Sequence, residues 1–190
     1  MILWIHGFAS CGLSHKSLLL REHFGAGRVL APDLPPEPEA ALALLEDLIR
    51  RHPVRVLAGA SLGGYFATWL QGRHGLPAVL INPAVVPYLL LEDYLGSHRD
   101  CHGNPFEVTR ETLEALHRLH RPQLPQRERY LVLLATGDEI LDWRQAAQYY
   151  AGKDLIVHRG GDHRFQDLAP YLPRIEAWIE QHAQETPTAP

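Results

Sequence analysis

The sequence predicts an α/β domain with a mostly parallel sheet of six strands flanked by helices. Six short runs rich in valine, isoleucine and leucine recur at residues 2–5, 29–31, 54–58, 78–81, 130–135 and 155–158. These runs are continuous rather than alternating, as expected for strands that are buried on both faces. Helix-like stretches separate most of them, and such an alternation of strands and helices is typical of a parallel sheet.

Apolar spacing and end signals predict the main helices. They span residues 39–51 and 64–74, a stretch from residue 142 to about residue 151, and a last stretch that begins near residue 170 or 173. Pro53 and Gly75 follow the first two, as expected at helix ends. Asp142 supplies an N-cap for the third.

Residues 82–129, called the insertion below, separate two predicted strands by more than one crossover helix needs. The insertion contains one well-marked helix, which begins after Thr109 and ends before Pro122. The insertion is either a crossover connection with an additional surface loop or a small cap over a site. Long insertions in compact domains are usually functional or disordered, which favours the cap. We expect one domain over residues 1–183 and a frayed tail over residues 184–190.

Composition and charge exclude several classes of protein. Hydrophobic residues make up 46% of the chain and charged residues 21%, close to globular averages. A net charge of −4 provides no basic field for nucleic acid or an anionic membrane. The N-terminal sequence MILWIHGF has no basic region or cleavage site, and its apolar run is too short to span a bilayer. Cys11 and Cys101 are the only cysteines, which gives no disulfide framework and fits a reducing compartment. We therefore expect a soluble, cytoplasmic protein.

Ser61 lies between Gly59 and Gly63, where the apolar run VRVLA changes into the helix-like YFATWL. Serine and glycine are ordinary turn residues, so the simplest interpretation is a loop. The context instead favours a nucleophile elbow, in which a strand bends sharply into a helix and exposes a serine hydroxyl. Glycines two residues before and after the serine prevent a clash at such a bend.

A serine nucleophile needs a base, and in this arrangement an acid and then a histidine follow it along the chain, each after a strand. Asp138 follows the run YLVLLA, and His163 follows the last run together with two glycines. Each residue alone is better explained as a turn or surface residue, but their order and positions together predict a catalytic triad. Glu139 is a weaker substitute for the acid, and Asp142 is better explained as a helix cap.

Acyl transfer also requires donors for the developing oxyanion. The backbone N–H of Leu62, directly after the nucleophile, is one expected donor, and the N–H of Phe8 in the loop after the first strand is the other. Gly7 permits a close backbone approach there, and His6 is expected to shape the loop.

Other patterns do not fit their motifs. Gly25 and Gly27 precede a strand and lack the third glycine of a dinucleotide site, and Lys16-Ser17 lacks the glycines of a P-loop. The histidines and cysteine of the insertion match no standard zinc spacing, and solvated side chains explain them as well; they are His98, Cys101, His102, His117 and His120.

Several sequence blocks form a recognisable combination: HGFASCGLSHKSLLL, APDLPP, GASLGGYFATWL, INPAVVPYLLLEDYLG, LATGDEILDWRQAAQYY and GGDHRF. On these blocks, from Met1 to about Ile179, the chain resembles the YqiA-like bacterial esterases, compact members of the α/β-hydrolase superfamily. The resemblance implies Ser61 as nucleophile, Asp138 as acid and His163 as base. The chain departs from such sequences at Asp162, where asparagine is frequent, and at Val86, where arginine is frequent.

The resulting prediction is a compact α/β-hydrolase with its second strand outside the first and its third on the other side. It would cleave carboxylic esters through an acyl-enzyme, without cofactor or metal, and its partner would be a small-molecule ester or thioester. A thioesterase is the first alternative and a non-catalytic hydrolase-fold binding protein the second. Six residues of the insertion are expected to wall a slot for the acyl group, or else to pack the insertion against the sheet: Val85, Val86, Tyr88, Leu89, Leu90 and Leu91. The oligomeric state stays open.

Overall fold

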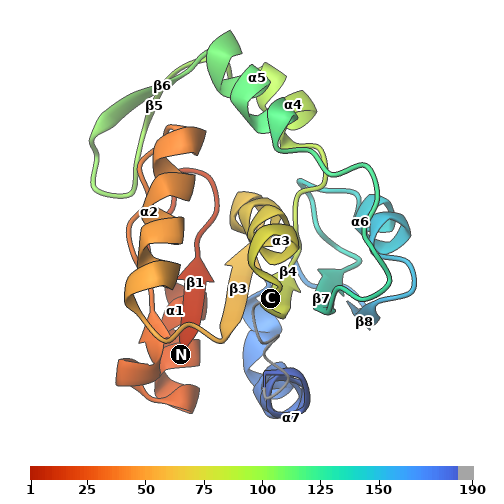
Figure 1. The fold of residues 1–190 in the computed structure, drawn as a ribbon. Coiled ribbons are helices and arrows are strands. Elements are labelled where there is room, and N and C mark those ends of the chain that lie inside the picture. Colours follow the sequence, from red (N-terminus) through yellow and green to blue (C-terminus); the bar gives the residue numbers. More distant parts are fainter. Residues whose placement is uncertain (184–190) are drawn as a thin grey trace.

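Six parallel strands form the central sheet of the computed structural model, which describes residues 1–183 of the 190. The strands are β1 (Ile2–Ile5), β2 (Val29–Leu30), β3 (Val56–Ala60), β4 (Ala78–Ile81), β7 (Tyr130–Ala135) and β8 (Asp154–His158). Their order is β2-β1-β3-β4-β7-β8, and every neighbouring pair is parallel (Figure 1). This confirms the predicted fold class and the placement of β2 and β3 on opposite sides of β1.

The helices are α1 (His15–Phe24), α2 (Pro38–Arg51), α3 (Leu62–His74), α4 (Pro87–Leu90), α5 (Arg110–Arg118), α6 (Trp143–Tyr149) and α7 (Leu172–His182). Three 3₁₀ turns, η1 (Ala26–Arg28), η2 (Leu91–Tyr94) and η3 (Gln166–Tyr171), connect some of them. The side chain of Asp142 accepts a hydrogen bond from the backbone of Arg144, which confirms it as the N-cap of α6. No helix within residues 1–183 has the length and apolar character needed to cross a membrane.

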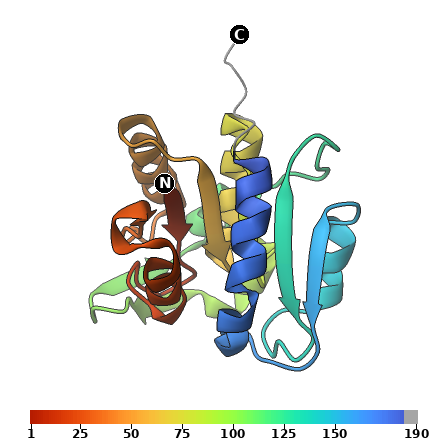
Figure 2. The ribbon, with the colours of Figure 1, turned by 90° about the horizontal axis from the view of Figure 1, so that it is seen from below.

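Two apolar cores lie on opposite faces of the sheet, so the fold has three layers (Figure 2). Leu3 and Ile5 of β1 pack with side chains from α2, α3, α5 and α6, whereas Ile2 and Trp4 pack with α1 and α7. Because successive side chains of a strand point to opposite faces, a continuous apolar run supplies both cores.

The insertion leaves the sheet after β4 and returns at β7. It contains α4, η2, α5 and an antiparallel hairpin of β5 (Gly96–Arg99) and β6 (Pro105–Val108). Figure 1 shows these elements beyond the end of the sheet to which the strand arrows point. That is the carboxyl end of the strands, where ligand sites of parallel sheets are found.

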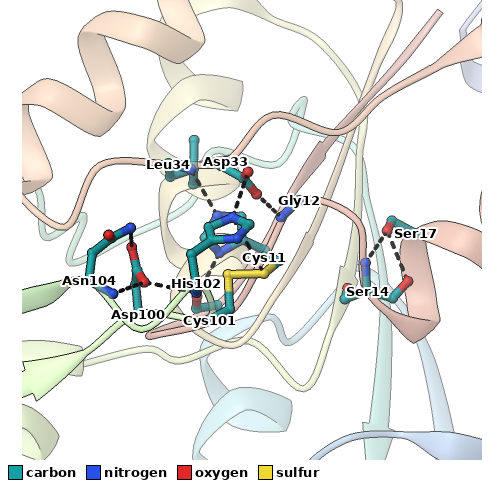
Figure 3. Close-up of a disulfide and its surroundings, with 12 residues drawn as sticks. Cys11, Gly12, Ser14, Ser17, Asp33, Leu34, Asp100, Cys101, His102 and Asn104 are labelled. Atoms are coloured by element: carbon teal, nitrogen blue, oxygen red, sulfur yellow. Dashed lines mark hydrogen bonds and ion pairs between the residues drawn. A yellow bond between two sulfur atoms is a disulfide. The ribbon is translucent and has the colours of Figure 1, made fainter.

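Cys11 and Cys101 form a disulfide, so the expectation of free thiols is wrong (Figure 3). Cys11 follows β1 and Cys101 lies in the turn of the hairpin, yet their Cα atoms are 5.7 Å apart. The pairing depends on the hairpin folding back over the loop after β1, which no pattern in the sequence indicates. The argument for a reducing compartment from unpaired cysteines therefore no longer holds.

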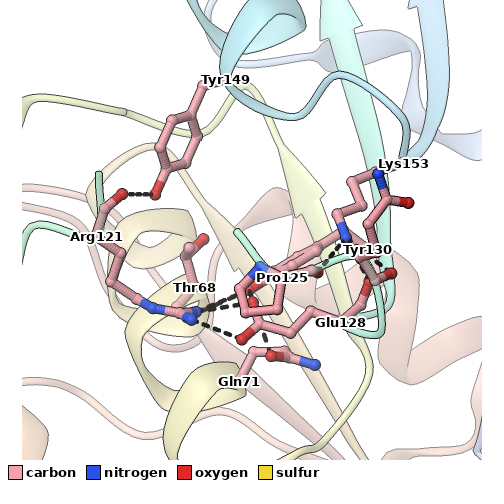
Figure 4. Close-up of polar contacts among 9 residues, drawn as sticks. Thr68, Gln71, Arg121, Pro125, Glu128, Tyr130, Tyr149 and Lys153 are labelled. Carbon is pink, nitrogen blue, oxygen red and sulfur yellow. Dashed lines mark hydrogen bonds and ion pairs between the residues drawn. The ribbon is translucent and has the colours of Figure 1, made fainter. Parts of the chain in front are cut away.

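A network of hydrogen bonds connects the C-terminal end of the insertion to the core (Figure 4). The Arg121 guanidinium donates to both carboxylate oxygens of Glu128, at 2.6 and 2.9 Å, and also to the backbone carbonyl of Thr68 at 3.0 Å. The Tyr130 hydroxyl donates to Glu128 at 2.8 Å, and Lys153 donates to the Glu128 carbonyl at 3.0 Å. The buried Glu128 carboxylate is therefore compensated by charge and by hydrogen bonds.

Candidate active site

Ser61 occupies a sharp bend between β3 and α3, as the elbow interpretation predicts. Its φ of 52° and ψ of −121° lie in a region that side-chain-bearing residues rarely adopt, so the surrounding structure must hold it there. The backbone N–H of Ser61 donates to the Ile81 carbonyl at 3.1 Å, and its carbonyl accepts from the N–H of Ala84 at 3.1 Å. The neighbouring strand β4 and the turn after it therefore hold the bend.

Glycines make room for this bend. A Cβ at Gly59 would overlap the carbonyl oxygen of Gly63, and a Cβ at Gly63 would overlap the carbonyl oxygens of Ile5 and His6. A Cβ at Gly7 would lie 3.2 Å from the Cβ of Ser61, tighter than an ordinary carbon contact. The loop after β1 can thus approach the elbow closely only because these positions lack side chains.

Asp138, His163 and Ser61 form one chain of hydrogen bonds, although they come from three separate strand ends. The Nε2 atom of His163 lies 3.1 Å from the Oγ of Ser61, and its Nδ1 lies 2.8 Å from the Oδ2 of Asp138. The other carboxylate oxygen of Asp138 accepts from the backbone of Ile140 at 2.9 Å and Leu141 at 2.8 Å. The Asp138 side chain is 1% exposed, so its hydrogen-bond partners rather than water determine its orientation.

This geometry fixes the roles of the two imidazole nitrogens. An ionised carboxylate only accepts, so Nδ1 carries the hydrogen that faces Asp138, and in the neutral ring Nε2 is an acceptor for the Ser61 hydroxyl. The neighbouring Glu139 accepts from the backbone N–H of His163 at 2.9 Å, not from its ring. Glu139 therefore positions the loop of His163, and Asp138 is the carboxylate that orients the ring.

Asn82 is a site residue that the sequence interpretation did not single out. It is buried, follows β4 and has a positive φ of 41°. Its side-chain oxygen accepts from the backbone of Ala135 at 2.8 Å, and its amide donates to the carbonyls of Asp162 at 3.1 Å and His163 at 3.2 Å. Asn82 thus joins the end of β7 to the loop that carries His163. The block INPA contained this residue, but only the tertiary contacts give it a role.

The loop after β1 places Phe8 next to the elbow, and Leu62 is the first residue of α3. Because Leu62 begins the helix, its N–H has no carbonyl one turn earlier to bond within the helix. His6 is buried; its Nδ1 donates to the Gly7 carbonyl at 2.9 Å and its Nε2 accepts from the backbone N–H of Leu34 at 2.9 Å. Burial lowers the pKa of His6, which keeps the ring neutral in this arrangement. His6 therefore shapes the loop, as expected.

A cleft of about 670 Å³ opens over Ser61 and His163, within the size range of small-molecule sites. Its apolar lining includes Leu13, Leu90, Leu91, Tyr94 and Ile140, three of which belong to the insertion.

The structure places the residues expected to wall an acyl slot in different surroundings. Leu91 lines the cleft, but among the described residues Val86 and Tyr88 lie outside this lining. Tyr88 packs on the rings of His117 and His120, and Val86 packs against the core. Leu90, also among the residues expected at the slot, lines the cleft, and Tyr94 of η2 joins it.

Asp162, one of the two departures from YqiA-like sequences, directs its carboxylate to the side-chain amide of Gln166, 2.5 Å away. That hydrogen bond is the largest cause of a lowered pKa for Asp162. The Asp162 carboxylate, the negative charge expected beside His163, therefore bonds to Gln166 at the start of η3.

Comparisons with known proteins find one family that matches almost the whole chain. A model of the family described as "Uncharacterised protein family (UPF0227)" matches residues 1–180. The UPF0227 protein YcfP of Salmonella paratyphi A is 25% identical over 186 residues, which cover 94% of this chain and 98% of that protein. A UPF0227 protein of Serratia proteamaculans is 22% identical over 200 residues, with the same coverage of 94% and 98%.

Solved structures with the same fold carry hydrolase names. Alpha/beta hydrolase domain-containing protein 10 from mouse matches with a TM-score of 0.74 and 17% identity, over 95% of this chain and 89% of that one. An esterase domain from Rhodothermus marinus matches with a TM-score of 0.71 and 20% identity, over 96% of this chain and 87% of that one. A monoacylglycerol lipase from Paleococcus ferrophilus matches with a TM-score of 0.72 and 16% identity, over 95% of this chain and 94% of that one. These matches show that the chain shares the α/β-hydrolase fold.

Proposed function

We propose, from the premise that this chain belongs to the UPF0227 family, that it is a serine hydrolase that cleaves carboxylic esters through an acyl-enzyme. The observation that carries the proposal is the hydrogen-bonded chain from Asp138 through His163 to Ser61, with 2.8 and 3.1 Å between the joined atoms. The esterase and lipase names of the structural neighbours support it.

In the proposed reaction, Nε2 of His163 takes the proton of Ser61 while Oγ attacks the ester carbonyl carbon. The oxyanion that forms accepts hydrogen bonds from the N–H groups of Phe8 and Leu62. The protonated ring, stabilised by Asp138, then donates its proton to the departing alkoxide, which leaves as an alcohol. Water attacks the acyl-enzyme in the second half, giving its proton to His163, and the carboxylic acid leaves as Ser61 is restored.

We further propose that residues 1–183 form a single domain and that the insertion caps its site. Leu90, Leu91 and Tyr94 of the insertion contribute to the wall of the cleft, and the disulfide fixes the hairpin against the loop that carries Phe8. An acyl chain of a substrate would lie against this apolar wall.

The test uses a fluorophosphonate probe and a series of acyl esters. The parent should be labelled at Ser61, and Ser61→Ala should lose both the label and several orders of magnitude of ester hydrolysis. Asp138→Asn should lower kcat by about 10³–10⁴-fold, because the ring loses the partner that holds its tautomer.

Asp142→Ala is the matched control for Asp138→Asn. It removes a nearby carboxylate whose hydrogen bond caps α6, so it should cost about 1 kcal/mol of stability and leave kcat unchanged. A parent that is neither labelled nor active on esters or thioesters would leave the non-catalytic binding protein as the better description. The opposite ranking of the two aspartate variants would show that the acid is misassigned.

One observation favours thioesters as a second substrate class. The charged side chains that line the cleft beside the histidines are Lys16 and Arg164, both cationic. A substrate with an anionic leaving group would gain from this charge, as thioesters of phosphate-bearing thiols do. A higher kcat/KM for such thioesters than for neutral esters of the same acyl chain, lost in Arg164→Gln, would establish this preference.

A further inference from the structure

Four potential metal ligands, two of which form the disulfide, cluster outside the proposed catalytic residues. They are Cys11 from the loop after β1, Asp33 from the loop after β2, and Cys101 and His102 from the hairpin turn (Figure 3). One ligand atom from each residue lies within 4.8 Å of all the others. Three separate segments contribute, which explains why no spacing in the sequence predicts the cluster.

The donor types suit zinc. Zn²⁺ in proteins is bound tetrahedrally by cysteine sulfur, histidine nitrogen and carboxylate oxygen, which places neighbouring ligand atoms about 3.3–3.8 Å apart. The Nε2 of His102 lies 3.8 Å from the sulfur of Cys11 and 2.9 Å from the Oδ2 of Asp33. The sulfur atoms are joined and must separate before both can bind an ion.

The orientation and exposure of Asp33 and His102 suit them to act as metal ligands. The backbone N–H of Gly12 donates to the Oδ1 of Asp33 at 2.7 Å, which is the largest cause of a lowered pKa for this carboxyl and leaves Oδ2 toward the cluster. The side chains of His102 and Asp33 are 54% and 57% exposed, so an ion can reach them and small adjustments cost little.

We propose that reduction of the Cys11–Cys101 disulfide creates a zinc-type metal site whose four ligands are Cys11, Cys101, His102 and Asp33. A thiol reductant supplies two electrons and two protons to the sulfur–sulfur bond, giving two thiols and the disulfide of the reductant. Binding of the divalent ion then releases the thiol protons and leaves two thiolates as ligands. Disulfide and metal are alternative links between the same two segments.

Either link holds the hairpin to the loop after β1. That loop also carries Phe8, whose ring contacts Phe106 of β6 with centroids 5.6 Å apart. The metal therefore preserves, under reducing conditions, the contact between the insertion and the loop that the disulfide provides under oxidising conditions. The inference concerns binding and does not depend on the proposed hydrolase activity.

The experiment titrates the full-length protein with Co²⁺ without oxygen, after reduction by a phosphine and removal of any bound metal. Reduced parent should develop the thiolate-to-cobalt charge-transfer band and the intense visible bands of tetrahedral cobalt, and Zn²⁺ should abolish both. Protein kept oxidised should develop neither. Zinc should also protect Cys11 and Cys101 of the reduced protein from alkylation, mapped by mass spectrometry.

His102→Ala should weaken zinc affinity by about 10–100-fold or more, since removing a ligand costs at least as much as removing an outer partner. His117→Ala, which removes an exposed histidine elsewhere in the insertion, should bind as the parent does. Cys101→Ser, which leaves Cys11 as the one thiolate ligand, should show a weaker charge-transfer band than the parent. If it fails to fold, the histidine pair still decides the question. Absence of the cobalt bands in the reduced parent, or equal affinity in His102→Ala and His117→Ala, would overturn the proposal.

Discussion

At the scale of single residues, Asn82 connects three backbone segments that must meet for Ser61 and His163 to face each other. Its side chain uses the acceptor and both donors of one amide, bonding to Ala135, Asp162 and His163. No other uncharged side chain of this size supplies both a hydrogen-bond acceptor and two donors. Replacing Asn82 by a side chain of the same shape should therefore disturb these hydrogen bonds.

Asn82→Asp tests this role. The aspartate keeps an acceptor for Ala135 but loses the donors to two carbonyls, so the free energy of unfolding should fall by about 1–3 kcal/mol. Ester hydrolysis per folded molecule should also fall, because the loop of His163 loses its tether. Thr68→Val, which removes a buried hydroxyl bonded to Tyr150, is the control: urea unfolding should show a comparable loss of stability with activity retained. Equal activity in both variants would contradict a positioning role.

His6 predicts a pH dependence of stability. Its pKa is lowered by burial, so between its ordinary value of about 6.5 and the folded value the unfolded chain binds more protons than the folded chain. The stability that His6 contributes is therefore fully present above that ordinary value and is lost as the pH falls toward the folded pKa. The difference in unfolding free energy between parent and His6→Gln should shrink from about pH 7.5 to about pH 5.5.

Sequence reasoning could group Ser61, Asp138 and His163, which the structure brings within hydrogen-bond distance, because their order after successive strands is informative in this fold. It could not find Asn82, because an asparagine after a strand is an ordinary turn residue until its partners are known. The sequence left open whether Tyr88 walls a slot or packs the insertion, for a related reason. Apolar character marks a side chain as buried but does not say against what.

At the scale of elements, the strands were predictable and the hairpin was not. The sheet strands are continuous apolar runs, and β1, β4 and β7 have the expected bounds. β3 begins two residues later than expected, at Val56, and extends through Ala60 to the elbow. The hairpin strand GSHR is largely exposed and contains no large apolar residue. In PFEV only Phe106 and Val108 alternate with exposed residues, and two apolar positions are too short a pattern to distinguish a strand from a loop.

Two arginines of the insertion, each paired with a glutamate, allow its anchoring to be measured. Arg121 and Glu128 are 20% and 8% exposed, whereas Arg118 and Glu39 are 63% and 66% exposed. Arg121→Ala should lower the free energy of unfolding by on the order of 3 kcal/mol, because it leaves the Glu128 carboxylate buried without its partner. Arg118→Ala should cost less than about 1 kcal/mol. Chemical denaturation of both variants checks this, and similar costs would show that burial does not govern the anchor.

At the scale of the whole molecule, the cleft is built by parts from different regions. The sheet supplies Ser61 and His163, while the insertion supplies Leu90, Leu91 and Tyr94. In the proposed hydrolase, separate parts of the chain would therefore carry the chemistry and the choice of acyl group. A change in the insertion should alter preference without altering the catalytic residues.

Neighbouring leucines of α4 test this separation. Leu90 lines the cleft, and Leu89 on the same helix is 55% exposed and outside the lining. Ser61 should be labelled by fluorophosphonates of increasing chain length in each protein. In Leu90→Ala the preferred chain should become longer, and each added methylene should change the free energy of activation for labelling by at most about 1–3 kcal/mol. The profile of Leu89→Ala should match the parent. Identical profiles in all three proteins would place the acyl chain elsewhere.

The disulfide also has a consequence for the connectivity of the chain. The link closes a covalent ring between Cys11 and Cys101, and this ring contains β2, β3, α3 and β4 with Ser61, while Asp138 and His163 lie outside it. In the oxidised protein, one peptide-bond cleavage inside the ring leaves both fragments covalently joined. A cleavage after Cys101 has no such protection, so a cut between β6 and β7 separates Ser61 from its two hydrogen-bonded partners. Proteolytic nicks on the two sides of residue 101 are therefore not equivalent for this molecule.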